Sequence, residues 1–380
     1  MDINGNGEKK MLEIVKFIHE HEDWENLLSN APYNLKISWD DGFVLFKYNQ
    51  INSDFNEKIC REARGLILDS TDNFKVVRFA FEKFFNLEES FAAHIDWDTA
   101  VASEKIDGSI MSVWFGRGKW HLSTNSTIDA FKAGLNSIGP YKNFGELFES
   151  VLPLSTFKNY NKHRCWTFEL VSPYNKVVIN YPETKVYLLS VRDMDSLDEL
   201  CPDAVEMLAD ANGLAVPEHY NFNNKEDYSN LVKEMDDTHE GIVVRDDNGK
   251  RVKIKTLTYF DLHKKKNNGV MTLERVLDLI MKNDQAEFLS YFPEMTPYFD
   301  EVAKKYSDAI KNILEIDVEV THWKTSRGLY PNRRKHFAEW VKDKPDKNLY
   351  FLAYDEKLLE KAKDSSAKDF IRLVRMEEEE

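Results

Sequence analysis

The spacing of apolar residues changes once along the chain, near residue 260. Before this point, short runs rich in Val, Ile, Phe and Tyr are separated by turn residues, which is typical of β-strands. After it, apolar residues recur every three or four positions, as in 300–316, which is typical of amphipathic helices. The charged segment 263–269 separates the two patterns and is expected to be a linker. The sequence therefore predicts an α+β protein, with an antiparallel-sheet domain over 1–262 and an all-helical C-terminal domain over 263–380.

The antiparallel arrangement is predicted from the turns between the strand-like runs. The sequences STDN at 70–73, GRG at 116–118 and DDNG at 246–249 each read as a hairpin connection. Hairpins join neighbouring strands that run in opposite directions. Helices are expected to interrupt these strands at 9–29 and at about 127–150.

Composition and charge limit the functional classes. No apolar run approaches the roughly eighteen residues of a membrane span, and the N-terminus MDINGNGEKK lacks the features of a signal peptide. We therefore expect a cytoplasmic protein without a membrane partner. The three cysteines form no CxxC pair, which argues against a zinc site and a disulfide framework. Because the net charge is -15, binding to nucleic acid would require a local basic surface.

Two strand-like segments carry charged residues that a simple strand does not need. In SEKIDGSIMSVWF, 103–115, Lys105, Asp107 and Gly108 stand at the front of an alternating run, and Lys105 and Asp107 are expected to share a face. In RVKIK, 251–255, the two lysines are likewise expected to share one strand face. A solvated strand end and a solvent-facing polar face are the simpler interpretations of these two patterns.

Two glutamates favour a functional interpretation over a solvated surface. Glu169 lies among bulky apolar neighbours in WTFELV, where a carboxylate is unfavourable unless it is paired. Glu240 opens the strand that precedes the two lysines, Lys253 and Lys255. Together with Lys105, these residues predict an anion and metal site on a β platform.

The segment Lys105–Gly108 resembles the Lys-x-Asp-Gly motif of the covalent nucleotidyltransferases, the superfamily of polynucleotide ligases and mRNA capping enzymes. The other elements of that signature are matched, in chain order, by REARG (61–65), FEL (168–170), VYLLSVR (186–192), EGIVV (240–244) and VKIK (252–255). Longer stretches are similar to the single-strand RNA ligase family of T-even phages, namely FEKFFNLEE (81–89), FELVSPYNKVVINY (168–181) and KVYLLSVRD (185–193). The resemblance covers about 43–262.

This resemblance implies a nucleotidyltransferase fold and an ATP-dependent RNA ligase. Such an enzyme joins 5′-phosphate and 3′-hydroxyl RNA ends through lysyl-AMP and RNA-adenylate intermediates, in the repair of RNA or tRNA. The implied cofactors are ATP and Mg²⁺, with Mn²⁺ as a substitute. The implied partner is RNA with these ends, such as nicked tRNA, and we expect a monomer in the cytoplasm, or in the host cytoplasm if a phage encodes the chain.

The resemblance also implies roles for single residues. Lys105 would be the nucleophile, Asp107 and Glu240 would hold the metal ion, and Lys253 and Lys255 would act with them in catalysis. Glu169 would bind the ribose of ATP, Tyr48 and Lys83 the β- and γ-phosphates, and Val243 with Leu188 or Leu189 the adenine. The full set of implied cofactor-binding residues is Tyr48, Arg64, Lys83, Glu104, Gly108, Glu169, Leu188, Val243, Lys253 and Lys255.

One position departs from the family pattern. Asn125 stands where the T-even enzyme has a lysine, so no phosphate contact is expected there. Outside the resemblance, the stretch RGLYPNRRKHFAEW, 327–340, is either a solvated helix start or an RNA-backbone contact.

The alternative functions make different predictions. A DNA ligase or a capping enzyme would normally add an OB-fold barrel after VKIK, whereas this C-terminal part is helical. A non-catalytic RNA-binding relative would be expected to lack Lys105, Glu169 or the lysine pair, and all of these are present.

Overall fold

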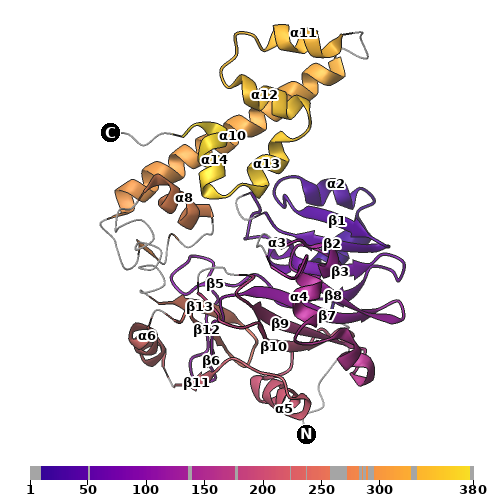
Figure 1. Ribbon diagram of the computed structural model, residues 1–380, viewed down its shortest axis with the longest axis vertical. Helices are drawn as coiled ribbons and strands as arrows, with labels where there is room; N and C mark the ends of the chain where they lie inside the picture. The colour runs from indigo at the N-terminus through magenta and orange to yellow at the C-terminus, as the bar shows by residue number, and fades with distance from the viewer. Residues whose placement is uncertain are drawn as a thin grey trace. The chain divides into compact units, whose positions relative to one another are not determined.

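The computed structural model describes residues 10–49, 52–135, 139–175, 179–222, 224–236, 238–256, 272–281, 285, 288–289, 295–326 and 332–376. The chain divides into two compact units, Met1–Asp261 and Leu262–Glu380 (Figure 1). Sheets dominate the first unit, and the regular elements described in the second are helices. The predicted α+β class, with antiparallel sheets before a helical C-terminal part, is therefore confirmed. The predicted linker at 263–269 falls outside the described residues.

The first sheet of unit 1 is antiparallel and has the strand order β1-β2-β3-β4. Its strands are β1 (Lys36–Asp40), β2 (Phe43–Lys47), β3 (Arg64–Asp69) and β4 (Lys75–Arg78). The helices packed against it are α1 (Glu13–Glu20), α2 (Trp24–Ser29) and α3 (Lys58–Glu62). Ile14, Leu28 and Ile59 bring these helices into one apolar core with the strands.

The second sheet has the order β10-β9-β7-β8 and is also antiparallel. Its strands are β7 (Ser109–Gly116), β8 (Lys119–Thr124), β9 (Arg164–Val171) and β10 (Lys185–Asp193). One face carries Phe168 and Leu170, which pack with Phe148 of α4 (Phe144–Glu149) and Val205 of α5 (Pro202–Asn212). Because side chains alternate along a strand, Glu169 points to the opposite face of this sheet.

The third sheet has the order β11-β6-β12-β13-β5. Its strands are β5 (Phe85–Asn86), β6 (Val101–Glu104), β11 (His219–Asn221), β12 (Gly241–Arg245) and β13 (Arg251–Lys255). The pairing is antiparallel except between β13 and β5, which run parallel over two residues. Ile242 and Ile254 on one face pack with Tyr228 and Val232 of α6 (Lys225–Glu234). The other face is thereby left to the predicted site residues.

Two predicted helices are shorter than expected. The stretch 9–29 forms α1 and α2 with a turn between them, and the stretch 127–150 forms a 3₁₀ helix (Ala130–Lys132) and α4. Gly134, Gly139 and Pro140 lie between the last two elements and disfavour a continuous helix. Asn143 instead starts α4, because its side chain accepts a hydrogen bond from the backbone N–H of Glu146. A second 3₁₀ helix, Leu154–Asn159, precedes β9.

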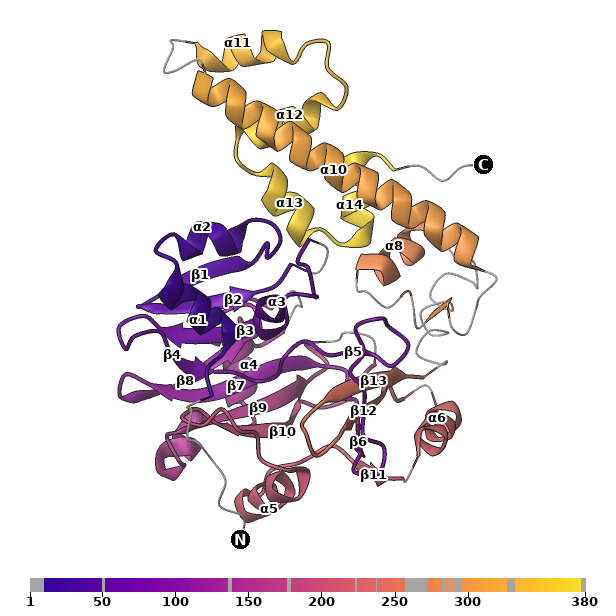
Figure 2. The same cartoon turned by 180° about the vertical axis from the view of Figure 1, so that it is seen from behind.

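Unit 2 is built along one long helix, α10 (Thr296–Ser326) (Figure 2). Its buried residues, such as Ile313, Ile316 and Val320, recur at three- and four-residue spacing. The shorter helices are α8 (Leu273–Met281), α11 (Arg333–Trp340), α12 (Lys347–Tyr354), α13 (Leu358–Asp364) and α14 (Ala367–Val374). Among the residues that the structure describes, no helix combines the length and the apolar character that crossing a membrane requires.

Candidate active site

The Lys105–Gly108 motif links two sheets and is not the front of a strand. Strand β6 ends at Glu104 in the third sheet, and β7 begins at Ser109 in the second. The backbone N–H of Lys105 donates to the carbonyl oxygen of Gly241 over 2.8 Å, which fixes the link against β12. The predicted sharing of a strand face by Lys105 and Asp107 is therefore wrong, since neither residue lies in a strand.

The glycine of this motif has a steric reason. A Cβ atom at Gly108 would overlap the carbonyl oxygen of Leu170 on β9. Only glycine therefore lets the link lie directly against β9, which also carries Glu169. The link thereby brings the motif close to the Glu169 face of the second sheet.

Glu240 joins Lys105 to Lys255 in a largely buried cluster. The Nζ atom of Lys105 lies 2.6 Å from Oε2 of Glu240, and Nζ of Lys255 lies 3.5 Å from Oε1. The side chains of Glu240 and Lys255 are 4% and 5% exposed, whereas that of Lys105 is 23% exposed. A solvated strand face therefore does not describe Lys255. The most accessible member of the cluster is the predicted nucleophile.

The register of β12 and β13 places the two lysines on one face. Lys253 pairs with Val243, and Lys255 pairs with Gly241, so these four residues share a side of the sheet. Gly241 has φ 143°, and a Cβ atom there would overlap the carbonyl oxygen of Ile254. The predicted common face of Lys253 and Lys255 is present, and it lies opposite the α6 core.

Glu169 comes within electrostatic range of the same cluster. Its side chain is 8% exposed, and burial raises its pKa to about 8. The nearby charges of Lys105 and Arg64 lower the pKa, whereas the carboxylates of Glu240 and Asp107 raise it further. Burial thus favours the protonated form of Glu169, which is able to donate a hydrogen bond.

Asp107 is held in place by a loop after β9. One of its carboxylate oxygens accepts a hydrogen bond from the backbone N–H of Ile179 over 2.7 Å. Its own backbone N–H donates to the hydroxyl oxygen of Tyr181 over 3.2 Å. Asp107 is buried, and these contacts fix both its carboxylate and its backbone.

Lys83 sits among three aromatic rings. Its Nζ atom lies 4.7 to 4.9 Å from the ring centroids of Tyr48, Phe55 and Phe85, within the range of cation–π attraction. The structure therefore brings together the predicted Tyr48 and Lys83. Sequence reasoning missed Phe55 and Phe85. Phe85 lies in the quoted stretch 81–89 with Lys83, whereas Phe55 comes from a separate segment that forms no local pattern with it.

Arg64 offers an unused donor. Its guanidinium group lies 4.8 Å from the ring centroid of Phe84. The Nη1 atom is buried and has no hydrogen-bond partner among the described residues. A buried cationic donor of this kind is suited to an anionic ligand.

Comparison with known proteins places these residues in a family. A family model described as RNA ligase matches residues 62–267, which is more than half of the chain. The chain belongs to this RNA ligase family. The predicted family is confirmed, and the match favours an RNA ligase over the DNA ligase and capping alternatives.

Individual relatives carry the same description. An RNA ligase of Rhodothermus phage RM378 is 26% identical, over 82% of this chain and 84% of that protein. A putative bifunctional polynucleotide kinase/RNA ligase of Autographa californica nuclear polyhedrosis virus is 25% identical over 86% of this chain but only 47% of that longer protein. Among solved structures, an archaeal ATP-dependent RNA ligase has a TM-score of 0.48 and 14% identity, covering 93% of this chain and 86% of its own.

The departure at Asn125 has a structural explanation in this ligase. Arg78 is fully buried, and its Nη2 atom donates to Oδ1 of Asn125 over 2.6 Å. Its Nε atom donates to the hydroxyl of Ser112, and Nη1 donates to the backbone oxygen of Arg64 over 3.1 Å. Burial, together with the charge of Arg64, lowers the pKa of Arg78 to about 10. A lysine at 125 would put a second cation against this group.

Two predicted cofactor-binding residues are not brought to the site. Leu188 pairs with Phe168 and is 1% exposed in the apolar core, so it points away from Glu169. This corrects the predicted adenine contact of Leu188, because the partner of Glu169 on its own face is Tyr187. A β-bulge between Leu188 and Ser190 changes the alternation here, and the sequence carries no clear signal for it.

Glu104 is the second of these residues. It pairs with Ile242, which places its side chain on the face opposite Val243 and Lys253. Its carboxylate lies 4.0 Å from Nε2 of His239, and burial raises its pKa. The structure thus keeps Val243 on the face of the candidate site and places the Glu104 side chain elsewhere.

The carboxylates of the ligase fit one kind of metal site. Within the described residues, no group of three His, Cys, Asp or Glu side chains is arranged to hold a metal ion. Mg²⁺ usually takes one or two carboxylates together with substrate phosphates and water molecules. Two carboxylates, those of Asp107 and Glu240, match that donor chemistry better than an all-protein cage.

Two arginines of the basic stretch in the C-terminal unit make contacts within that unit. Arg334 makes a bidentate ion pair with Asp355, with distances of 2.7 and 3.1 Å. The guanidinium group of Arg333 lies 5.9 Å from the ring centroid of Trp323, which is a buried residue. These contacts favour a structural helix at 333–340 over an RNA contact, while 327–331 falls outside the described residues.

Proposed function

We propose that this ligase seals RNA strands that carry a 5′-phosphate and a 3′-hydroxyl end, with ATP and a divalent metal ion as cofactors. The observation that carries the proposal is the cluster of Lys105, Glu240 and Lys255 beside Glu169 and Asp107. This cluster lies inside the segment that matches the RNA ligase family.

In the first step, the neutral amine of Lys105 attacks the α-phosphorus of ATP. A P–N bond forms, the bond to the bridging oxygen breaks, and pyrophosphate leaves with that electron pair. The amine must first lose a proton, and cations such as Lys255 favour its neutral form. Lys253 and Lys255 then stabilise the charge that develops on the phosphoryl oxygens. Mg²⁺ or Mn²⁺, held by Asp107 and Glu240, would add positive charge beside these oxygens.

The remaining side chains are assigned to the nucleotide. A protonated Glu169 is able to donate to a ribose hydroxyl, and Val243 and Tyr187 supply apolar surface for the adenine. Arg64, with its buried unpaired Nη1 atom, suits a phosphate oxygen. Lys83 beside Tyr48 supplies a second positive charge for the β- and γ-phosphates.

Two further steps complete the proposed reaction. An oxygen of the RNA 5′-phosphate attacks the lysyl-AMP phosphorus, the P–N bond breaks, and Lys105 leaves as an amine that regains a proton. The 3′-hydroxyl then loses its proton, attacks the 5′-phosphorus, and AMP leaves. We propose that the enzyme acts as a monomer in the cytoplasm, and that the helical unit favours structured substrates such as nicked tRNA. Comparing ligation of nicked tRNA with ligation of an unstructured oligonucleotide tests this preference.

Covalent labelling tests the central assignment. Incubation with Mg²⁺ and α-labelled ATP, followed by denaturing electrophoresis, should show an acid-labile label on the protein. Lys105→Arg should abolish the label, because a guanidinium group stays protonated near neutral pH. A label that persists in Lys105→Arg or Lys105→Ala would show that the nucleophile lies elsewhere.

A further inference from the structure

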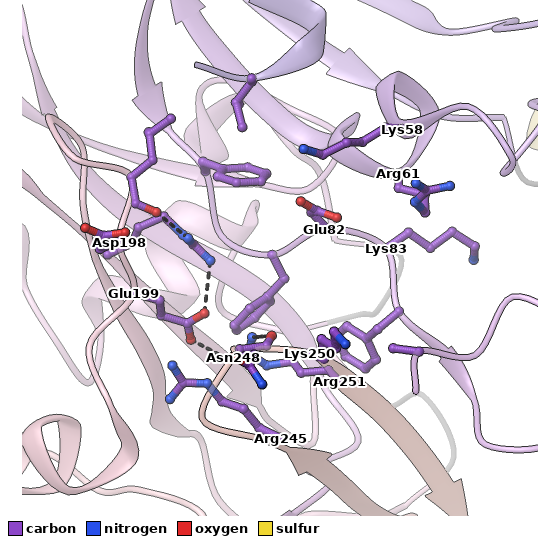
Figure 3. A pocket seen from close by; sticks show the side chains of 18 of the residues that line it. Lys58, Arg61, Glu82, Lys83, Asp198, Glu199, Arg245, Asn248, Lys250 and Arg251 are labelled. Carbon is purple, nitrogen blue, oxygen red and sulfur yellow. Dashed lines mark hydrogen bonds and ion pairs between the residues drawn. The ribbon is translucent and has the colours of Figure 1, made fainter. Parts of the chain in front are cut away.

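Unit 1 has a cationic cavity of about 640 Å³, which extends from Lys83 of the candidate nucleotide site to the β12–β13 hairpin (Figure 3). The cavity is lined by twice as many lysines and arginines as carboxylates, although the whole chain carries a net charge of -15. Figure 3 shows Lys58 and Arg61 above the cavity, and Arg245 and Lys250 of the β12–β13 hairpin below it. This is the local basic surface that an acidic protein needs in order to bind a polyanion.

Three arginines surround one carboxylate in the wall of this cavity. Nη2 of Arg192 lies 2.9 Å from Oε2 of Glu199, and Nη2 of Arg251 donates to Oε1. Burial alone would raise the pKa of Glu199, but Arg251, Arg192 and Arg245 together lower it to about 2. Three cations thus surround Glu199, and Glu82 of the same cavity adds a further negative charge near Arg192.

Two of these arginines also keep buried donors unused. The Nε atoms of Arg192 and Arg245 have no hydrogen-bond partner among the described residues. Uncompensated positive charge and unused donors both favour an anionic ligand.

The guanidinium groups are fixed before any ligand arrives. That of Arg251 lies 4.8 Å from the ring centroid of Phe81, and that of Arg192 lies 4.8 Å from Phe79. Stacking on rings and pairing with Glu199 restrict their rotation, so little entropy is lost on binding. Such planar, preorganised groups match the oxygens of a phosphate.

The cavity lies on the same sheet face as the catalytic lysines. Arg251 pairs with Arg245, and both alternate in phase with Lys253 and Lys255. At about 3.3 Å per residue, Arg251 lies about 7 Å from Lys253 and about 13 Å from Lys255 along β13. An RNA strand whose terminal phosphate reaches Lys253 and Lys255 would therefore place one of its neighbouring backbone phosphates at the cavity.

We propose that this cavity binds a backbone phosphate of the RNA strand, within a few nucleotides of its reacting end. The inference rests on the proposed function, because it takes the reacting end to lie at Lys105. A free phosphate compound such as pyrophosphate offers the same chemistry, so the test separates the two sources.

Lys250→Glu is the principal variant. Lys250 is exposed, lines the cavity and has no ion-pair partner among the described residues. The matched control is Lys119→Glu, which makes the same change of charge at another exposed lysine outside the cavity. Binding of a short 5′-phosphorylated single-stranded RNA is measured by fluorescence anisotropy at several salt concentrations, and lysyl-AMP formation is measured separately with ATP alone.

The proposal predicts that Lys250→Glu weakens RNA binding by about tenfold, as expected for one charged contact. The slope of log affinity against log salt should fall by about 0.7 for one lost phosphate contact. Lys119→Glu should bind RNA like wild type, and both variants should form lysyl-AMP at the wild-type rate. Equal RNA affinity in the two variants would overturn the proposal. The proposal would also be overturned if Lys250→Glu bound RNA like wild type but formed lysyl-AMP more slowly, or if pyrophosphate no longer inhibited lysyl-AMP formation in that variant. Either result would show that the cavity binds a free phosphate compound.

A second variant tests the buried wall. Arg245→Gln removes one guanidinium group but leaves Glu199 paired with Arg192 and Arg251, so the fold should persist. It should weaken RNA binding as Lys250→Glu does, and wild-type RNA affinity in this variant would argue against the site. Wild-type protein that fails to form lysyl-AMP would refute the proposed function instead, whatever the RNA binding shows.

Discussion

The ammonium nitrogen of Lys105 lies 2.6 Å from a carboxylate oxygen of Glu240, a residue 135 positions further along the chain. The backbone reinforces this contact, because Lys105 N–H donates to the carbonyl oxygen of the adjacent Gly241. The predicted nucleophile is thus positioned by the long-range pairing of β12 with β6 and β13, not by its own segment. Changes in this pairing should therefore affect the chemistry as well as the fold.

Replacement of Lys253 or of Lys255 should slow the same chemical step, and replacement of the buried Lys255 should also reduce stability. Replacement of either by Met should slow lysyl-AMP formation by about 10²–10³-fold, the range for losing one donor to a developing oxyanion. Lys255→Met should also lower the melting temperature, because the Lys255 side chain is 5% exposed and shares Glu240 with Lys105. Single-turnover labelling and thermal melts distinguish the two effects. A wild-type melting temperature in Lys255→Met would show that the Lys255–Glu240 pair does not stabilise the fold.

Glu169 should make the stability of the unliganded protein fall as pH rises. Its folded-state pKa of about 8 exceeds the ordinary value, so the folded state holds a proton that the unfolded state has already lost. The contribution of Glu169 to the free energy of unfolding is then greatest below about pH 4.5 and is lost progressively as the pH rises to about 8. Glu169→Gln should flatten this decline in melting temperature. Glu62, which is buried with a pKa raised to about 7, should leave part of the slope.

The matched control for the Glu169 prediction is Glu183→Gln. Glu183 is an exposed carboxyl in the same unit. Its variant should keep the wild-type pH dependence. A Glu169→Gln protein with the same slope as this control would mean that Glu169 is ionised in the folded state.

Gly108→Ala should disrupt the crossover between the two sheets. A Cβ atom there would overlap the carbonyl oxygen of Leu170, and overpacking of this kind costs about 1–3 kcal/mol. Lysyl-AMP formation should fall with it, because the same link carries Lys105. Gly134→Ala is the control, since a Cβ atom at Gly134 meets nothing within 4 Å. Wild-type labelling in Gly108→Ala would show that the link tolerates a shift.

Local patterns in the sequence were enough to predict the strands, the helical C-terminal part and the signature residues. Apolar alternation in RCWTFELV, for example, is a property of one segment, and it forms β9 as expected. The alternation in 103–115 wrongly predicted one strand with Lys105 and Asp107 on the same face, because the pattern runs without a break from β6 through the crossover into β7. Sheet membership depends on which strands pair, and this information is not contained in a single segment.

Features built from several segments could not be predicted for the same reason. The rings around Lys83 come from three places in the chain. The position of Leu188 depends on a bulge against β9. Arg78 stands at the end of the short strand β4, and it is fully buried by contacts from β3, β7 and the segment after β8.

Asn125 offers the sharpest test of that buried arginine, because substitutions of opposite charge should act in opposite directions. Asn125→Lys would place a second cation where Oδ1 now accepts from Arg78, so it should lower the melting temperature and impair ligation. Asn125→Asp would instead give Arg78 a carboxylate partner and should keep or raise the melting temperature, since a buried cation gains a counterion. Thermal melts of both variants near neutral pH check the prediction. If Asn125→Lys were as stable as wild type, Arg78 would have to be uncharged or able to leave its site, and the structural explanation for the missing family lysine would fail.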